Sequence, residues 1–222
     1  MIGGIIFART SSTRLPSKIL KKIQNRTILE HIIERIKKSN LEKIILATTE
    51  NKIDDELVAI AKNNNIEYFR GSENDVLDRC YRAAKMFSID PVVRITGDDP
   101  IKDPSIIDQA IKIYNKSTPK FDLVCNTLNP TFPEGLDVEL FSFNALEIVW
   151  QNAKNQDDRE HVTKYIYEHS REFKIFNFEN TKNLSNIRLT LDTEEDFELI
   201  KSIYDALFPM DASLLDFRLN EK

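Results

Sequence analysis

A basic, hydroxyl-rich loop near the amino terminus is well suited to binding an anion. Residues 8–18 read ARTSSTRLPSK, with Arg9, Arg14 and Lys18 as cations. They follow an apolar run at 2–7, and charged side chains and backbone N–H groups at the end of a buried strand can surround a polyphosphate. The loop lacks the GK[ST] ending of a Walker A loop and is not a dinucleotide fingerprint. The alternative interpretation is a solvated basic turn.

Two later segments place carboxylates where a metal ion could be held. Asp98 and Asp99 follow the apolar run 92–96 in GDDP, and Asp192 lies in LTLDTEED. Mg²⁺ prefers oxygen ligands and usually takes one or two protein carboxylates together with phosphate oxygens. One acid of GDDP could therefore be a ligand, while the other caps the following helix. The alternatives are a turn in which both acids of GDDP accept backbone N–H groups, and a helix N-cap at Asp192 or Thr193.

A further acidic pair occurs in GLDVE. If this segment is a strand, Asp137 and Glu139 point to the same face. That arrangement would suit the hydroxyl groups of an acceptor or a second metal ion. The alternative is an exposed edge strand whose acids prevent pairing with other chains.

Alternating patterns predict the elements that must position these residues. In the first half, β-branched runs at 2–7, 44–49, 66–69 and 92–96 alternate with helical stripes, which indicates βαβ units and a mostly parallel sheet flanked by helices. The second half predicts strands at 122–125, 136–141, 174–178 and 187–191, and helices near 144–152, 159–169 and 194–207. In such α/β sheets, ligands bind beyond the carboxyl ends of the strands.

The chain shows no linker, repeat or low-complexity tract, so we expect a single domain over 1–222. The nucleotide-binding half would be about 1–120 and the acceptor-binding half about 121–222. A net charge of −5 argues against broad binding to nucleic acid or to an anionic membrane. Cys80 and Cys125 lie outside any metal-type spacing. MIGGIIFART is too short to span a membrane and lacks signal-peptide features, so we expect a cytoplasmic protein.

The first loop resembles the signature of the sugar-activating cytidylyltransferases, A-R-x-x-S-x-R-x-P-x-K. The matching residues are Ala8, Arg9, Ser12, Arg14, Pro16 and Lys18. Members of this family attach CMP to acylneuraminate or to 3-deoxy-manno-octulosonate. The resemblance over nearly the whole chain is to the group of spore coat polysaccharide biosynthesis protein F. It implies a nucleotide-diphospho-sugar-transferase-like fold (GT-A, Rossmann-like), CTP as the donor and Mg²⁺ as the cofactor.

The resemblance also implies roles for the first loop and for two acids. Arg9, Arg14 and Lys18 would contact the triphosphate, assisted by Ser12 and by the loop backbone from Ala8. The family's GD[EDC]P motif places a metal-binding aspartate at Asp98. Its late D-T-x-E-D segment places the second metal ligand at Asp192, with Glu194 standing where proline is common.

For the base and the acceptor the resemblance is less exact. Relatives use an arginine near the third strand for the base, which favours Arg79 over Arg70. A surface pair between Arg79 and Asp75 is the alternative. GLDVE is typical of the spore-coat-type group, which favours an acceptor-side or metal-adjacent role for Asp137 and Glu139.

REHVT is nearly identical in similar proteins. We expect it to open the helix 159–169, with Arg159 and His161 as acceptor contacts or supporting residues.

The resulting hypothesis is in-line attack by an acceptor oxygen on the α-phosphorus of CTP, with pyrophosphate leaving. Arg9, Arg14, Lys18 and Asp98 would be the catalytic residues. The acceptor would be sugar-acid-like and the product would serve surface polysaccharide synthesis. A phosphonate acceptor, glycosyltransfer from a nucleotide sugar and a non-catalytic nucleotide-binding module are the alternatives. The resemblance further implies a homodimer in which residues 130–159 complete a neighbour's site.

Overall fold

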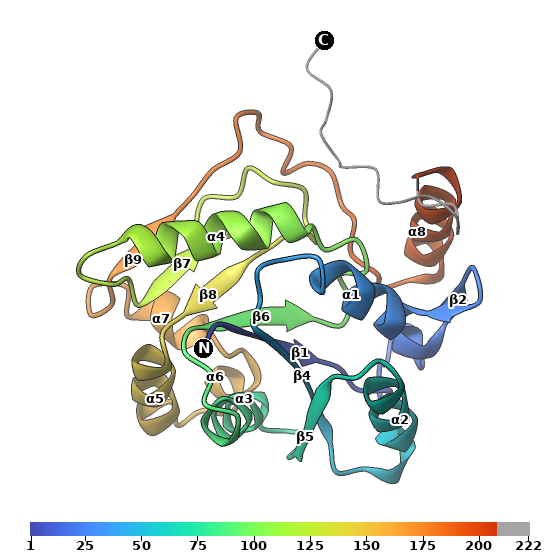
Figure 1. Cartoon of the computed structure of the whole chain (residues 1–222), viewed down its shortest axis with the longest axis horizontal. Helices are drawn as coiled ribbons and strands as arrows, with labels where there is room; N and C mark the ends of the chain where they lie inside the picture. Colours follow the sequence, from blue (N-terminus) through green and yellow to red (C-terminus); the bar gives the residue numbers. More distant parts are fainter. Residues whose placement is uncertain (208–222) are drawn as a thin grey trace.

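A seven-stranded sheet forms the centre of the computed structural model, which describes residues 1–207 (Figure 1). Across the sheet the strands follow in the order β5 (Glu67–Gly71), β4 (Lys43–Thr49), β1 (Gly3–Phe7), β6 (Val92–Thr96), β8 (Glu139–Phe141), β7 (Leu123–Cys125) and β9 (Ile175–Asn177). Within this sheet β8 alone runs against its neighbours, and the other strands pair in parallel. The predicted α/β class with a mostly parallel sheet is confirmed.

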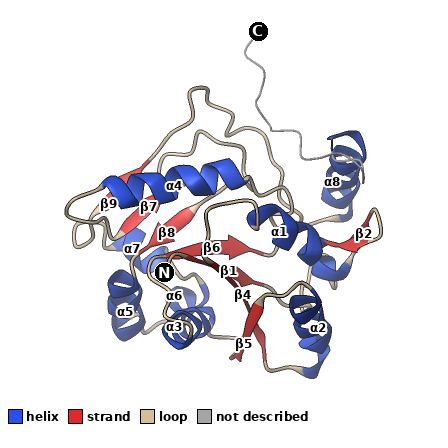
Figure 2. Cartoon of the chain, in the orientation of Figure 1, coloured by secondary structure: helices blue, strands red, loops and turns tan. Residues whose placement is uncertain are grey.

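Helices cover both faces of the sheet, as Figure 2 shows. One face packs against α1 (Ile28–Ile36), α2 (Asp55–Asn63), α4 (Pro104–Lys116) and α8 (Glu194–Leu207). The other face packs against α3 (Val76–Met86), α5 (Phe143–Asn152) and α7 (Lys164–Glu168). This coverage explains why the central strands are apolar on both sides: in β1 and β4, nearly every side chain is buried.

Short elements complete the description. A small antiparallel pair, β2 (Lys22–Ile23) and β3 (Arg26–Thr27), follows the 3₁₀ turn η1 (Lys18–Leu20). A second 3₁₀ turn, η2 (Lys52–Asp54), precedes α2, and α6 (Gln156–Glu160) precedes α7. Helix α1 begins at a capping box, in which Thr27 accepts from the backbone of Glu30 while the Glu30 carboxylate accepts from Thr27.

The second half departs from the sequence prediction in three places. Strand β8 begins only at Glu139, so 136–138 are not part of it. Residues 187–191 form no strand and contribute one isolated bridge, between Arg188 and Glu134. The helix predicted at 159–169 is two short helices, α6 and α7.

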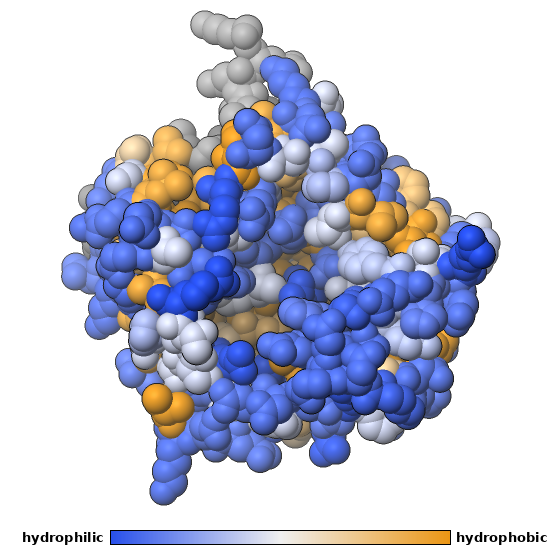
Figure 3. Space-filling view, turned by 180° about the vertical axis from the view of Figure 1, so that it is seen from behind, coloured by the Kyte–Doolittle hydropathy of each residue, from blue (hydrophilic) through white to orange (hydrophobic). Residues whose placement is uncertain are grey.

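The face seen in Figure 3 is mainly hydrophilic and is hollowed near its middle. No helix of the described residues is long and apolar enough to cross a membrane. The parallel order places the carboxyl ends of β1, β4, β5 and β6 at one edge of the sheet. Because β8 is antiparallel to β6, its first residue lies at that same edge, with Glu139 paired in register with Arg94.

Candidate active site

A cleft of about 380 Å³ lies at this edge. Its walls come from the loop after β1, the loop after β6, the start of α3, the end of α6 and the segment before α8. Of the residues singled out in the sequence, those lining it are Ala8, Arg9, Ser12, Arg14, Lys18, Arg79, Asp98, His161 and Asp192. Most of the predicted nucleotide and metal residues are therefore brought together.

The basic loop is held in shape by a buried carboxylate. Both the backbone N–H and the hydroxyl of Thr10 donate to Oδ1 of Asp54, at 2.8 and 2.6 Å, and the hydroxyl of Thr49 donates to its other oxygen. Burial opposes the charge, but these hydrogen bonds outweigh it and lower the pKa of Asp54. The carbonyl of Thr10 in turn accepts from the N–H groups of Ser12 and Ser17. Asp54 thus fixes the centre of the loop and leaves its cations free to face the cleft.

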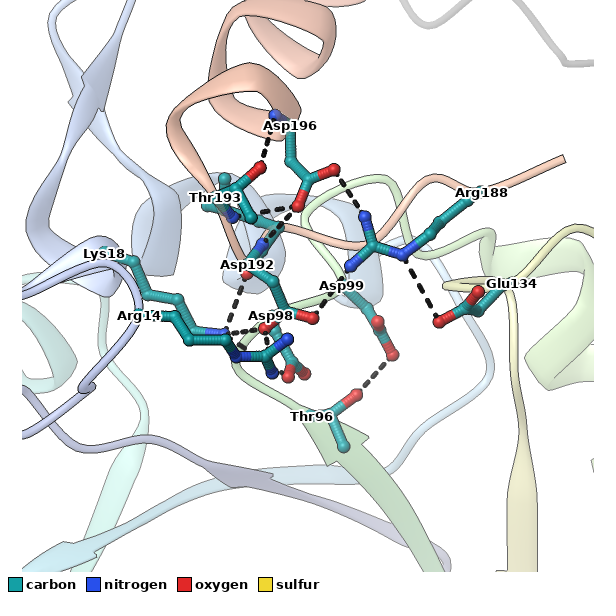
Figure 4. Close-up of polar contacts among 11 residues, drawn as sticks. Arg14, Lys18, Thr96, Asp98, Asp99, Glu134, Arg188, Asp192, Thr193 and Asp196 are labelled. Atoms are coloured by element: carbon teal, nitrogen blue, oxygen red, sulfur yellow. Dashed lines mark hydrogen bonds and ion pairs between the residues drawn. The ribbon is translucent and has the colours of Figure 1, made fainter.

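Lys18 joins the loop to both predicted metal ligands (Figure 4). Its ammonium lies 2.9 Å from Oδ1 of Asp192 and 3.4 Å from Oδ2 of Asp98, and it also donates to the carbonyl of Leu191 at 2.8 Å. The two carboxylates therefore converge on one cation, although they come from opposite halves of the chain.

Asp192 is surrounded by positive charge. Arg14 lies 2.9 Å from its Oδ1, and Arg188 lies 2.8 Å from its Oδ2. Arg188 also pairs with Asp196 and approaches Glu134 at 3.6 Å (Figure 4). Burial alone would raise the pKa of Asp192, but the hydrogen bond from Lys18 and the charges of Lys18, Arg14 and Arg188 lower it. Asp192 is therefore ionised and can bind a cation.

Of the two residues considered as the helix N-cap in the late segment, Thr193 caps α8 and Asp192 does not. The Asp196 carboxylate accepts from the backbone N–H groups of Asp192 and Thr193, and the Thr193 hydroxyl accepts from the N–H of Asp196. These contacts stabilise the start of α8 without the side chain of Asp192. That side chain is directed to the cleft cations instead.

Gly97 lets the loop after β6 approach the end of β1. Its N–H donates to the carbonyl of Phe7 at 3.0 Å, and a Cβ at this position would lie 2.9 Å from that carbonyl oxygen. A larger residue would push the loop away. Gly97 therefore sets how closely Asp98 stands to the basic loop.

Asp99, the neighbour of Asp98, does not cap the next helix as one interpretation predicted. The cap of α4 is Asp103, which accepts from the N–H of Ser105. Asp99 accepts from the ammonium of Lys102 at 2.7 Å and from the hydroxyl of Thr96. Burial raises the pKa of Asp99, and the charge of Lys102 partly offsets this effect. The Asp99 carboxylate therefore forms a buried ion pair with Lys102 and does not act as a metal ligand.

Arg79 and Arg70 differ in what they can reach. The surface pair between Arg79 and Asp75 is wrong: Arg79 is buried, with 2% of its surface exposed, and donates to the carbonyl of Ser72 at 2.6 Å. Its Nε is buried without a hydrogen-bond partner among the described residues, and the side chain lines the cleft. Arg70 instead binds Asp55 and the carbonyls of Thr49 and Asn51, outside the cleft lining.

Glu139 lies in the interior of the sheet, so the exposed-edge interpretation is wrong for this residue. It is buried, lies 2.8 Å from Arg94 on β6, and accepts from the hydroxyls of Thr163 and Tyr167. Asp137 precedes the strand, so the shared-face argument does not hold. Both acids nevertheless line a second cavity of about 220 Å³ that adjoins the cleft.

REHVT does not open a helix. Arg159 lies near the end of α6 and binds Asp75, at 2.6 Å, and the carbonyl of Trp150, so it braces α3 against α5. It lines neither cavity. His161 is exposed, lies 3.6 Å from Asp157 and lines the cleft.

Two oxygen-donor side chains meet here, which fits a magnesium site shared with phosphate. The carboxylates of Asp98 and Asp192 are hard oxygen donors, and two carboxylates are within the number that Mg²⁺ usually takes from a protein. No group of three or more His, Cys, Asp or Glu side chains within residues 1–207 is arranged to hold a metal ion by itself. The donor set therefore suits an ion that takes its remaining ligands from a nucleotide and water.

Several residues of the site escaped the sequence analysis. Arg94 interrupts an otherwise apolar strand, which was a usable signal. Arg188 lies four residues before Asp192, and this spacing of opposite charges also indicated a possible ion pair. Asp54 gave no signal, because its partner Thr10 lies 44 positions away.

Comparison with known proteins agrees with this arrangement. Residues 4–215 match the family model described as cytidylyltransferase. An uncharacterized protein of Methanocaldococcus jannaschii is 48% identical over 199 residues, which is 88% of this chain and 80% of that protein. Spore coat polysaccharide biosynthesis protein SpsF of Bacillus subtilis is 31% identical, covering 90% of this chain and 85% of that one.

A solved structure shows the same likeness. A cytidylyltransferase from Leptospira borgpetersenii has 37% identity and a TM-score of 0.91, with 96% of this chain and 90% of that chain covered. The agreement therefore extends over both halves of the sheet.

Proposed function

The chain belongs to the cytidylyltransferase family and is a CTP-dependent nucleotidyltransferase, and from this we propose that it transfers CMP to a hydroxyl of a sugar-like acceptor. Pyrophosphate would be the second product. The role of the Bacillus subtilis relative in spore coat polysaccharide biosynthesis supports a place for the product in the biosynthesis of a surface polysaccharide or glycoconjugate.

One observation carries this proposal: cations and carboxylates of the required kinds meet in one cleft. Lys18 and Arg14 gather around Asp192 and Asp98 on one side. Arg79 lines the same cleft with an Nε that lacks a partner among the described residues. A triphosphate can lie along the basic loop while the cytosine accepts from Arg79.

The chain's own residues would act by holding and neutralising the substrate. Arg9, Arg14 and Lys18, with the N–H groups from Ala8 to Ser12, would bind the triphosphate and stabilise the leaving pyrophosphate. Asp98 and Asp192 would hold Mg²⁺, which when bound neutralises phosphate charge. The fixed loop would hold the α-phosphorus in line with the acceptor hydroxyl, so much of the rate would come from alignment.

Pyrophosphate release tests the proposal. Purified protein is assayed with CTP, UTP, ATP and GTP, with and without Mg²⁺, against a panel of sugar acceptors. We expect Mg²⁺-dependent release with CTP. Asp98→Ala should lose it, while Glu56→Ala, at an exposed position on α2, should retain it. Undiminished release by Asp98→Ala would refute the proposed role of this acid.

We also propose that the protein is a homodimer through the segment 130–159. Exposed apolar side chains at Leu128 and Ile148, beside and within this segment, support it. Sedimentation velocity of the wild type and of Ile148→Glu measures the effect. A wild type that sediments as a monomer at assay concentration would contradict the dimer.

A further inference from the structure

The second cavity is the natural place for the acceptor. Its volume is about 220 Å³, and four residues line both it and the nucleotide cleft: Arg94, Thr96, Asp98 and Asp192. A molecule in this cavity would therefore lie beside a nucleotide in the cleft. This assignment rests on the proposed function.

The lining of this cavity is strongly acidic. Its carboxylates are Asp98, Asp99, Glu134, Asp137, Glu139 and Asp192. Its cation is Arg94, and that charge is already matched by Glu139 at 2.8 Å. Asp99 is matched by Lys102 at 2.7 Å. If Asp98 and Asp192 serve a metal ion, two acids remain to face the acceptor.

These two acids are Glu134 and Asp137. Arg188 approaches Glu134 at 3.6 Å, but it lies closer to Asp192, at 2.8 Å, and also pairs with Asp196. Within residues 1–207, no cation pairs with the Asp137 carboxylate, which accepts only a long 3.4 Å contact from the N–H of Gly135. The ammonium of Lys102 lies nearby, but it donates to the backbone carbonyl of Asp137 at 2.6 Å and pairs with Asp99. The far side of the cavity therefore keeps uncompensated negative charge.

The cavity lining also includes a neutral polar residue. The hydroxyl oxygen of Thr190, a residue of the cavity lining, is buried and has no hydrogen-bond partner in the part of the chain that the structure describes. A buried hydroxyl is costly to leave unpaired. An acceptor hydroxyl or amino group would satisfy it, independently of the acids.

We propose that the acceptor is a neutral or amino-bearing polyol and not a sugar acid. Carboxylates accept hydrogen bonds from hydroxyl and ammonium groups, so Glu134 and Asp137 can bind either. A carboxylate placed in the cavity would meet like charges, and its one lining cation is held by Glu139. This departs from the sugar-acid-like acceptor that the family resemblance implies.

The test uses acceptors that differ only in charge. Each triad shares one polyol scaffold and carries a carboxylate, a primary alcohol or a primary amine at the same carbon. One triad has a six-carbon scaffold. Eight- and nine-carbon sugar acids are compared with their carboxyl-reduced forms in the same way. Each compound is titrated calorimetrically into the enzyme, with and without CMP and Mg²⁺. Pyrophosphate release from CTP is measured with the same compounds.

We expect the alcohol or amine to bind and react about tenfold better than the matched carboxylate, the size of one unfavourable charge contact of partly solvated groups. Asp137→Asn and Glu134→Gln should each reduce that difference. Glu195→Gln, an exposed acid at the start of α8 outside the cavity lining, is the matched control and should leave it unchanged.

Preference for the carboxylate in any triad, or failure of every polyol to bind, would overturn the inference. These outcomes are separable from failure of the proposed function. Absence of CTP binding and of pyrophosphate release would contradict the nucleotidyl transfer itself. Transfer that proceeds best onto the acid contradicts the acceptor class alone.

Discussion

The ammonium of Lys18 lies 2.9 Å from the Asp192 carboxylate, although 174 positions separate the two residues. The same nitrogen contacts Asp98, which lies in the loop after β6. One cation therefore ties the end of β1, the end of β6 and the start of α8 together. A phosphate group and its metal ion would therefore bind where Lys18, Asp98 and Asp192 already lie close together.

Loss of this cation should impair catalysis more than folding. Replacing Lys18 by Ala leaves two carboxylates facing each other and removes a charge next to the leaving group. We expect kcat to fall about 100- to 1,000-fold, as for loss of one preorganised electrostatic group. Steady-state pyrophosphate release measures this. Lys22→Ala, at an exposed position on β2, should change kcat little; equal losses in the two variants would contradict the role of Lys18.

Arg79 should decide affinity for the base. Arg79→Lys keeps the charge but removes the Nε–H, so a hydrogen bond from a charged group is lost. The KM for CTP should rise about 10- to 100-fold, since such bonds contribute about 1.5–3 kcal/mol. The preference for CTP over UTP should narrow. Arg82→Lys, on the same helix in a surface pair with Asp78, is the control. If Arg79→Lys left the preference for CTP over UTP unchanged, base recognition by Arg79 would be rejected.

Asp54 should stabilise the fold and shape the phosphate loop. Asp54→Asn removes a charged acceptor of three hydrogen bonds, and we expect the free energy of unfolding at pH 7 to fall by about 1–3 kcal/mol. The KM for CTP should rise because Thr10 loses its anchor. Urea unfolding and steady-state kinetics measure the two effects.

The difference in free energy of unfolding between the wild type and Asp54→Asn should depend on pH, because the pKa of Asp54 is lowered in the folded state. A carboxyl whose pKa is lower in the folded state stabilises the fold above its unfolded pKa of about 3.9, and this contribution is lost as pH falls through the folded pKa. The gap in stability between wild type and Asp54→Asn should therefore narrow in acid. A gap that widens below about pH 4 would contradict the assignment.

Gly97 should be intolerant of any side chain. The Cβ of Gly97→Ala would lie 2.9 Å from the Phe7 carbonyl oxygen, so β6 and its loop must shift. We expect a loss of about 1–3 kcal/mol in stability, typical of overpacking, and a larger loss of activity because Asp98 moves with the loop. Thermal unfolding and kcat are compared in one preparation. A variant with wild-type kcat would show that the position of Asp98 tolerates the shift.

The first half of the fold was predictable because its strands are buried on both faces. Runs such as 44–49 are then buried along their whole length, are mostly apolar, and are bounded by clear helical stripes. The segment 187–191 misled for a physical reason. Its alternation is real, but its backbone pairs with Glu134 and Asp98 across the ends of the strands and not within the sheet. Periodicity reports which side chains are buried, and not what the backbone binds.

Some residues of the candidate site could likewise be predicted from the sequence, and others could not. Lys18 and Asp98 could be named because each lies in a segment of unusual composition after an apolar run, whereas Asp192 was favoured by the resemblance to the family's late D-T-x-E-D segment. The pairing of Arg94 with Glu139 could not, since it depends on the register of two strands that are distant in sequence. The burial of Arg79 was likewise hidden, because its spacing from Asp75 matches an ordinary surface pair.

The reversed strand β8 has a consequence for how such an enzyme can diversify. It separates the parallel strands that carry the nucleotide residues from β7 and β9, and it contributes Glu139 to the second cavity. Replacements around residues 134–139 can therefore remodel the second cavity while the loop after β1 stays as it is. Duplicated genes can therefore change the acceptor by substitutions in this segment, while the residues that bind CTP stay unchanged.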